Sequence, residues 1–239
     1  MNSHVRAALA EMDSIIISKL EHPGSRALDE CSCRFLAAFL RATGARKVLE
    51  FGSGFSSLII AREIGALEDN YLLSIDNSAE DSGEARRNFE ISGSQARAEF
   101  RVARIGPRLY GTRLLLSYSL PKGLLEALGP FDLVLIDSPP HEHIREGIFY
   151  DAFNAVGPGG YIILDDANRE TEKENVRHWQ AAYGDAIRPI LLEGMGSGLN
   201  VIEKNLDALP APLSAGDSLM SSLRTLRIMG RALLRRDGK

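Results

Sequence analysis

The stretch Val48-Leu-Glu-Phe-Gly-Ser-Gly-Phe-Ser-Ser57 decides how the rest of the sequence is interpreted. An apolar run ends at Glu50, a Gly-Ser-Gly turn follows, and residues 58–64 have the composition of a helix. A strand that leads through glycines into a helix brings backbone N–H groups close to a ligand. A carboxylate at the strand end repels a pyrophosphate but suits a cationic or amino-bearing ligand. The turn therefore predicts a binding site for a ligand of that kind.

Strand-like and helix-like stretches alternate along most of the chain. The expected strands are 48–51, 71–76, 100–105, 131–137 and 160–165, and the expected helices are 56–64, 79–91, 143–156 and 170–183. Residues 186–192 and 199–203 predict a β-hairpin. The alternation predicts an α/β fold with a Rossmann-like, doubly wound, mostly parallel sheet, to which the C-terminal hairpin adds an antiparallel strand.

The pattern divides the chain into three parts. Residues 3–20 and 26–43 carry apolar residues at three-to-four spacing, which predicts two helices in an N-terminal cap, 1–45. The cofactor-binding core is expected over residues 46–206. Residues 207–239 form a linker containing Pro and Ala and a basic tail with arginines and leucines at helical spacing.

Two interpretations of the basic tail stay open. An amphipathic basic helix can lie on an anionic membrane as a peripheral contact, or on a partner. The interpretation that we favour is a solvated helix docked on its own domain or on a second copy of the chain, or a partly disordered segment. Because the tail follows a linker, its composition predicts that removing residues 217–239 leaves the melting temperature almost unchanged.

Composition narrows the class of protein. A chain of 239 residues with 44% hydrophobic and 25% charged residues fits an ordinary globular domain, and a net charge of -4 gives no reason to expect nucleic acid as a partner. No apolar run approaches the ~20 residues that span a bilayer. Cys31 and Cys33 stand too close together for a disulfide and indicate a reducing compartment. We expect a cytoplasmic protein that is a monomer or a homo-oligomer.

Acidic residues end four of the expected strands. Ligands of doubly wound sheets bind beyond the carboxyl ends of the strands, and Glu50, Asp76, Asp137 and Asp165 stand there. Asp76 follows the glycine turn by about two dozen positions, where an acid can accept hydrogen bonds from both hydroxyls of a ribose. The alternative is that Asp76 merely lies beside the start of a helix whose cap is Asn77 or Ser78.

Two further motifs point to one family. Phe131-Asp-Leu-Val-Leu-Ile-Asp137 has the form Phe-Asp-x-Val-x-x-Asp, and Gly157-Pro-Gly-Gly-Tyr161 leads into the next strand. Together with the glycine turn and Asp76, they resemble the motifs of class I S-adenosylmethionine-dependent methyltransferases, in the same order. The resemblance extends from Lys47 to Glu203. The resemblance implies methyl transfer from S-adenosylmethionine to a small molecule. The residues expected to bind the cofactor are Glu50, Gly52, Ser53, Gly54, Phe55, Ser56, Ser57, Asp76, Asn77 and Asp137.

The segment Asp165-Asp-Ala-Asn-Arg169 narrows the resemblance. It is similar to metal-dependent small-molecule O-methyltransferases of the catechol type, in which one carboxylate follows the fourth strand and an Asp-Asn or Asp-Asp pair follows the fifth. The similarity implies O-methylation assisted by Mg²⁺, with Asp137, Asp165 and Asp166 as hard oxygen ligands. In the alternative without metal, Asp165 is a general base and Asp166 caps the next helix, with Arg169 neutralising the cluster.

The candidate catalytic residues are Asp137, Asp165 and His141. His141 and His143 follow the strand that ends at Asp137, and a histidine there could accept a proton from a hydroxyl. A histidine in an exposed loop with no role is the alternative.

Two other functions stay open. An NAD(P)-dependent Rossmann oxidoreductase is disfavoured because Ser57 replaces the third glycine of the dinucleotide fingerprint. A non-catalytic cofactor-binding or scaffold protein is disfavoured by the intact set of strand-end acids. Residues 105–121 show no signature from which adenine contacts could be named.

Overall fold

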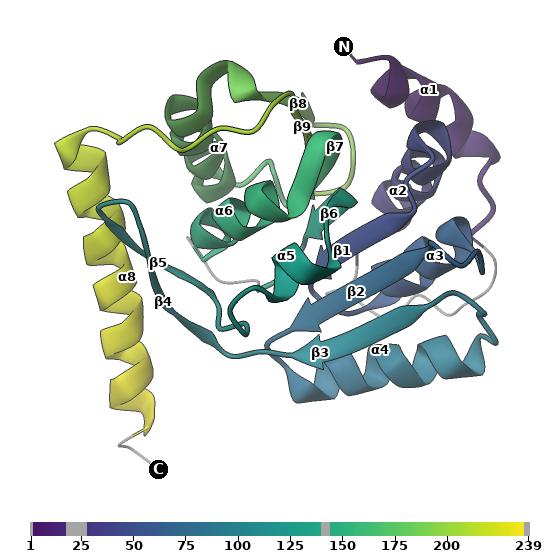
Figure 1. Cartoon of the computed structure of the whole chain (residues 1–239), viewed down its shortest axis with the longest axis horizontal. Coiled ribbons are helices and arrows are strands. Elements are labelled where there is room, and N and C mark those ends of the chain that lie inside the picture. The colour runs from purple at the N-terminus through teal and green to yellow at the C-terminus, as the bar shows by residue number, and fades with distance from the viewer. Residues whose placement is uncertain (1, 18–27, 140–143, 237–239) are drawn as a thin grey trace.

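A seven-stranded sheet forms the centre of the molecule (Figure 1). The structure is a computed structural model that describes residues 2–17, 28–139 and 144–236. The strand order is β3-β2-β1-β6-β7-β9-β8, and only β9 runs antiparallel to its neighbours. The strands are β1 (Lys47–Phe51), β2 (Tyr71–Asp76), β3 (Ala98–Val102), β6 (Phe131–Ile136), β7 (Val156–Leu164), β8 (Ile187–Leu192) and β9 (Leu199–Lys204).

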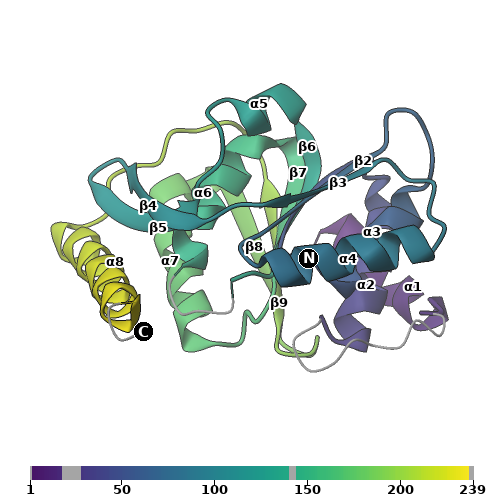
Figure 2. The same cartoon turned by 90° about the horizontal axis from the view of Figure 1, so that it is seen from below.

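Helices cover both faces of this sheet (Figure 2). One face carries α1 (Ser3–Glu11), α2 (Glu30–Thr43), α3 (Phe55–Ile64) and α4 (Ala79–Ile91). The other carries α5 (Leu124–Leu128), α6 (Arg145–Ala155) and α7 (Glu170–Tyr183). Short 3₁₀ turns span Met12–Ser14 and Gly184–Ala186, and α8 (Ala215–Arg236) lies at one end of the molecule. No helix among the described residues is long and apolar enough to cross a membrane.

The apolar residues of the strands divide between two cores. In β6, Leu133 and Leu135 pack with α1–α3, whereas Val134 and Ile136 pack with α6 and α7. This alternation follows from the two-residue period of a strand. Because both faces of the sheet are covered, the central strands β2, β6 and β7 are largely apolar, as is typical of parallel sheets.

The predicted fold class is confirmed. The bounds of β2, α4 and α7 are those expected, and the C-terminal hairpin supplies the antiparallel strand β9, which lies one position in from the sheet edge. The N-terminal helices are shorter than predicted. Asp29 caps α2, since its side chain accepts from the backbone N–H groups of Cys31 (2.9 Å) and Ser32 (3.2 Å), so the helix begins at Glu30.

The expected strand at 100–105 was wrong in extent, and a hairpin was missed. The sheet strand β3 ends at Val102, and β4 (Ile105–Tyr110) and β5 (Arg113–Tyr118) form a separate two-stranded ribbon that extends toward α8 (Figure 1). The turn residue Gly111 has φ of 61°. Pro107 lies inside β4, and a proline argues against a strand because it has no N–H for the ladder.

The basic tail is docked on its own chain. In α8, Ser221 and Thr225 are buried, the Arg113 guanidinium donates to the Ser221 hydroxyl (2.8 Å), and the Leu114 N–H donates to the Ser222 hydroxyl (3.2 Å). Arg224 of α8 forms a salt bridge with Glu174 of α7 (2.9 Å). These contacts agree with docking on the same domain. Because of these contacts, we no longer expect the melting temperature to stay unchanged when the tail is removed.

We predict that deleting residues 215–239 lowers the melting temperature by roughly 4–8 °C. The deletion removes the hydrogen bonds of Ser221 and Ser222 and lets water reach Arg113, a loss of about 2 kcal/mol. Thermal unfolding of the full chain, this deletion and a control lacking only residues 237–239 measures the effect. An unchanged melting temperature in the long deletion would show that the docking contacts contribute nothing.

Candidate functional site

A cavity of about 440 Å³ opens at the carboxyl ends of β1, β2, β6 and β7. Its size is that of a small-molecule site. The glycine turn, the start of α4, the ends of β6 and β7, and the starts of α2, α6 and α7 contribute to its wall. The lining residues are Leu28, Asp29, Gly52, Ser53, Gly54, Phe55, Ser56, Asp76, Asp81, Glu84, Ala85, Asn88, Asp137, Ser138, Arg145, Asp165, Asp166, Arg169 and Ser197.

The turn after β1 requires glycine at position 52. Gly52 has φ of 116°, and a Cβ there would lie 2.8 Å from the Cβ of Ser138. The N–H groups of Asp137 and Ser138 both donate to the carbonyl of Phe51 (2.9 Å each). The turn therefore packs directly on the end of β6, which brings the predicted cofactor residues beside Asp137.

Glu50 lies beneath this turn and does not line the cavity. Its fully buried carboxylate accepts from the hydroxyls of Ser56 and Ser57 in α3 and of Ser74 in β2 (2.7 Å for Ser74). Burial raises its pKa to about 7, although the three hydroxyls act in the opposite direction. In this geometry Glu50 holds the turn and the start of α3 in place.

Asp76 lines the cavity and also organises the chain around it. One carboxylate oxygen accepts from the Ser53 N–H (2.8 Å) and the other from the Ser78 N–H (2.7 Å). Burial raises its pKa. The N-cap of α4 is Ser78, whose hydroxyl accepts from the Asp81 N–H (3.1 Å). The cap and the acid are thus separate residues, and Asn77 is not part of the cavity wall.

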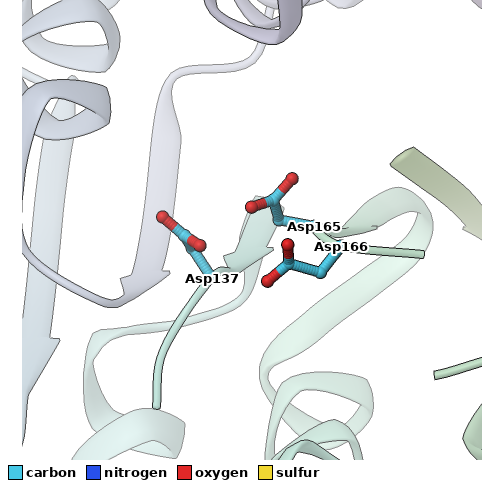
Figure 3. Close-up of side chains that lie close together, drawn as sticks. All are labelled: Asp137, Asp165 and Asp166. Carbon is cyan, nitrogen blue, oxygen red and sulfur yellow. The ribbon is translucent and has the colours of Figure 1, made fainter. Parts of the chain in front are cut away.

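Three carboxylates meet where β6 and β7 end (Figure 3). Asp137 follows β6, and Asp165 and Asp166 follow β7; one oxygen from each lies within 4.8 Å of the others. Arg145, buried at the start of α6, donates to Asp166 (3.0 Å) and to the Asp165 carbonyl (2.7 Å), and lies 3.7 Å from the Asp137 carboxylate. Arg169 bridges Asp166 from the other side (2.9 Å).

Asp166 has a left-handed backbone, with φ of 59°. Such a conformation is uncommon outside glycine and clusters at functional sites. The loop between β8 and β9 supports it, because the N–H groups of Ala167 and Asn168 donate to the carbonyls of Gly198 (2.9 Å) and Ser197 (3.0 Å).

Asp165 holds its proton more tightly than a free carboxyl group. Burial, followed by the negative charges of Asp137 and Asp166, raises its pKa to about 8. In the described part of the chain no lysine or arginine side chain bridges its carboxylate. Asp165 can therefore hold a proton near neutral pH, or release it when a cation or a basic acceptor arrives.

The N-terminal segment and the β8–β9 loop close the cavity together. Leu28 and Asp29 stand at the start of α2, and a Cβ on Gly196 would collide with the Asp29 carboxylate at 1.8 Å. The thiol of Cys31 lies 3.5 Å from the sulfur of Met195. The predicted cap over residues 1–45 thus contributes two residues to the wall.

Sequence reasoning missed several wall residues. Arg145 was not recognised, since nothing in the sequence says that the residue eight positions after Asp137 turns back to it. Four residues on one face of α4 were also missed, although their spacing beside Asp76 was a usable signal: Asp81, Glu84, Ala85 and Asn88. His141 and His143 lie outside the described residues, and Ser57 is buried behind the wall.

We predict that Glu50→Gln changes how stability depends on pH. The folded-state pKa of Glu50, about 7, exceeds its ordinary value of 4.5, so the wild-type protein loses stability as pH rises between these values and stays lower above them. The variant lacks this loss. Its free energy of unfolding should therefore gain on the order of 2–3 kcal/mol relative to wild type between pH 4.5 and pH 8.

Denaturant unfolding at both pH values, with the exposed Glu68→Gln as control, measures the difference. A gap between variant and wild type that does not change with pH would contradict this account of Glu50.

A family model described as a methyltransferase domain matches residues 49–167. This match confirms the family that the sequence motifs resemble. It extends from β1 to the acidic pair after β7, and so contains the glycine turn, Asp76 and the three carboxylates. No curated protein matches the sequence.

Solved structures show the same fold. An O-methyltransferase from Bacillus cereus in complex with S-adenosylhomocysteine has a TM-score of 0.57 and 18% identity over 86% of this chain and 92% of that chain. The O-methyltransferase TomG from Streptomyces achromogenes, in complex with S-adenosylmethionine, has a TM-score of 0.56 and 18% identity over 86% and 91%. The S-adenosylhomocysteine-bound methyltransferase PaMTH1 from Podospora anserina has a TM-score of 0.56 and 13% identity over 86% and 89%.

Proposed function

Since residues 49–167 belong to a family of methyltransferase domains, we propose that this protein transfers a methyl group from S-adenosylmethionine to an oxygen atom of a small molecule. The observation that carries the proposal is one cavity in which the glycine turn and Asp76 face the three carboxylates at the ends of β6 and β7. The first set suits the cofactor, and the second suits the acceptor.

The charge of the cavity supports this cofactor. S-adenosylmethionine carries a sulfonium and an amino group, and acidic side chains outnumber basic ones among the lining residues. Asp76 would accept hydrogen bonds from the ribose hydroxyls. Structures of the same fold were solved with this cofactor or its product. A pyrophosphate would meet only repulsion from the same acids.

The reaction requires alignment more than chemical activation. The acceptor oxygen attacks the methyl carbon, the new C–O bond forms as the S–C bond breaks, and S-adenosylhomocysteine leaves as a neutral sulfide. Holding the nucleophile in line with that carbon supplies much of the acceleration. The hydroxyl proton must go to a base, and Asp165, with a pKa of about 8, can take it near neutral pH.

The donor set at the acceptor end also fits a hard divalent cation such as Mg²⁺. Asp137, Asp165 and Asp166 would hold it, because each offers one oxygen, and the unbridged carboxylate of Asp165 is the one that gains most from added positive charge. When bound, such an ion binds acceptor oxygens and lowers the pKa of a hydroxyl. Arg145 keeps the carboxylates in place in either account, since it donates to the carbonyl of Asp137 after β6 and to that of Asp165 after β7.

We place the enzyme in the cytoplasm because Cys31 and Cys33 are free thiols. A small-molecule acceptor fits the cavity volume, and nucleic acid is not expected from the net charge of -4.

We predict that Asp76→Ala weakens binding of S-adenosylmethionine by about ten- to a hundredfold, because a charged acceptor for two hydroxyls is lost. Isothermal titration calorimetry with S-adenosylhomocysteine and NAD, on wild type, this variant and the exposed Asp69→Ala control, tests the assignment. Wild-type binding of NAD in preference to S-adenosylhomocysteine would overturn the methyltransferase proposal. Unchanged affinity in a folded Asp76→Ala would remove Asp76 from the site.

We predict that Mg²⁺ binds the wild-type protein and that Asp166→Ala weakens this binding by about tenfold or more, because one oxygen ligand is lost. Asp166→Asn is the matched control, since it keeps an oxygen and tolerates positive φ. Calorimetric titration of chelator-treated protein with MgCl₂ measures both. No binding to wild type would favour Asp165 as a base without metal and would leave the methyltransferase proposal intact.

A further inference from the structure

Helix α8 presents its two faces in an unusual way. The face against the domain combines small polar side chains, of which Ser221 and Thr225 are buried, with Ile228 and Met229, which pack on the core. The opposite face is apolar and open to solvent: Leu219, Met220, Leu223 and Leu226 are 60%, 52%, 49% and 52% exposed. A surface helix ordinarily buries its apolar stripe and exposes its polar one. The stripe Leu219–Leu223–Leu226 therefore lacks its expected cover.

The charge of this segment also differs from the rest of the chain. Residues 215–239 contain six basic and two acidic residues, whereas residues 1–214 contain 22 basic and 30 acidic ones. Arg227 and Arg231 are exposed and lie one turn apart along the edge of the apolar face. Within the described residues neither of them forms a salt bridge, unlike Arg224, which binds Glu174.

The position of α8 leaves this face accessible. The helix stands at one end of the molecule, beside the β4–β5 hairpin (Figures 1 and 2), and none of its described residues lines the cavity. Its contacts with the domain include hydrogen bonds and a salt bridge of Ser221, Ser222 and Arg224. Ile228 and Met229 pack on the core, and none of these five residues belongs to the apolar stripe. A flat partner could contact the stripe without displacing the helix.

We propose that the outer face of α8 docks on an anionic lipid bilayer as a peripheral contact. Leucines between arginines are the pattern of a helix that lies in the interface, with apolar side chains among the acyl chains and guanidinium groups at the phosphates. The proposal does not depend on the methyltransferase reaction.

A second copy of the chain fits this face less well. A symmetric pair through the stripe would bring two helices of net positive charge together, so that like charges oppose pairing. Four half-exposed side chains also form a smaller patch than the about 800 Å² per partner that a stable interface buries. A bilayer with anionic headgroups satisfies the charge and needs no shape complementarity.

Vesicle co-sedimentation of the full chain tests the proposal. The probes are vesicles of phosphatidylcholine alone and of phosphatidylcholine with phosphatidylserine. We expect binding to the anionic vesicles, little binding to the neutral ones, and a marked loss of binding at high salt, because charges at a surface are screened.

Substitutions separate the apolar and the charged contributions. We expect Leu223→Glu with Leu226→Glu, and separately Arg227→Glu with Arg231→Glu, to lower the partition coefficient on anionic vesicles about tenfold or more. The matched control is Leu67→Glu with Ile91→Glu, which changes two aliphatic side chains that are more exposed, at 65% and 82%, and that lie in the loop after α3 and at the end of α4. The control should bind like wild type, and the melting temperature of each variant verifies folding.

Three outcomes would overturn the proposal. These are absence of wild-type binding to anionic vesicles, equal binding to neutral vesicles, and α8 variants that bind as well as the control. Sedimentation velocity tests the alternative partner, a second copy of the chain. If the wild-type protein does not bind vesicles but forms a dimer, and Leu223→Glu with Leu226→Glu dissociates that dimer, the face belongs to a dimer interface.

Discussion

The arrangement of the site depends on Arg145. Three carboxylates whose oxygens lie within 4.8 Å of one another repel strongly in a partly buried cavity, and the guanidinium of Arg145 supplies buried positive charge beside two of them. Its N–H groups also reach the carbonyls of Asp137 and Asp165, where β6 and β7 end. A guanidinium can make these contacts together because its donors form a planar fork. The ends of two neighbouring strands and the charge between them are thus fixed by one side chain.

The next residue extends this constraint to the far end of the molecule. Glu146 is buried and pairs with Arg113 of the β4–β5 hairpin, lies 2.7 Å from His178 of α7, and lies 3.5 Å from the hydroxyl of Ser221 in α8. Consecutive residues at the start of α6 therefore face the cavity and the docked tail. The hairpin, α7 and α8 are therefore all held to α6 by the carboxylate of Glu146. Separating the hairpin from α6 would leave this buried charge without its partner, which is strongly destabilising.

How far the sequence predicts this structure depends on the range of the interactions concerned. The glycine turn, the acids Asp76, Asp137 and Asp165, and the alternation of strands and helices outside residues 98–128 follow from local patterns, and they are found where they were expected. The direction in which the Glu50 side chain points could not be predicted, because it depends on a hydrogen bond from Ser74 in the neighbouring strand β2. The role of Arg145 was not predicted for the same reason, because its contacts are with the ends of two strands, β6 and β7. The tail illustrates the limit most clearly, since its composition shows an amphipathic helix but not which face the domain would take.

The left-handed backbone of Asp166 separates the shape of the site from its charge. Asn and Asp are the side-chain-bearing residues that visit this conformation readily, so either one preserves the hydrogen bonds of Ala167 and Asn168 to the β8–β9 loop. Their side chains are nearly equal in size but differ by one unit of charge. A single exchange between Asp and Asn at this position can therefore change the charge of the cavity while the backbone of the site stays the same. Evolution or protein engineering can use such an exchange to alter the charge alone.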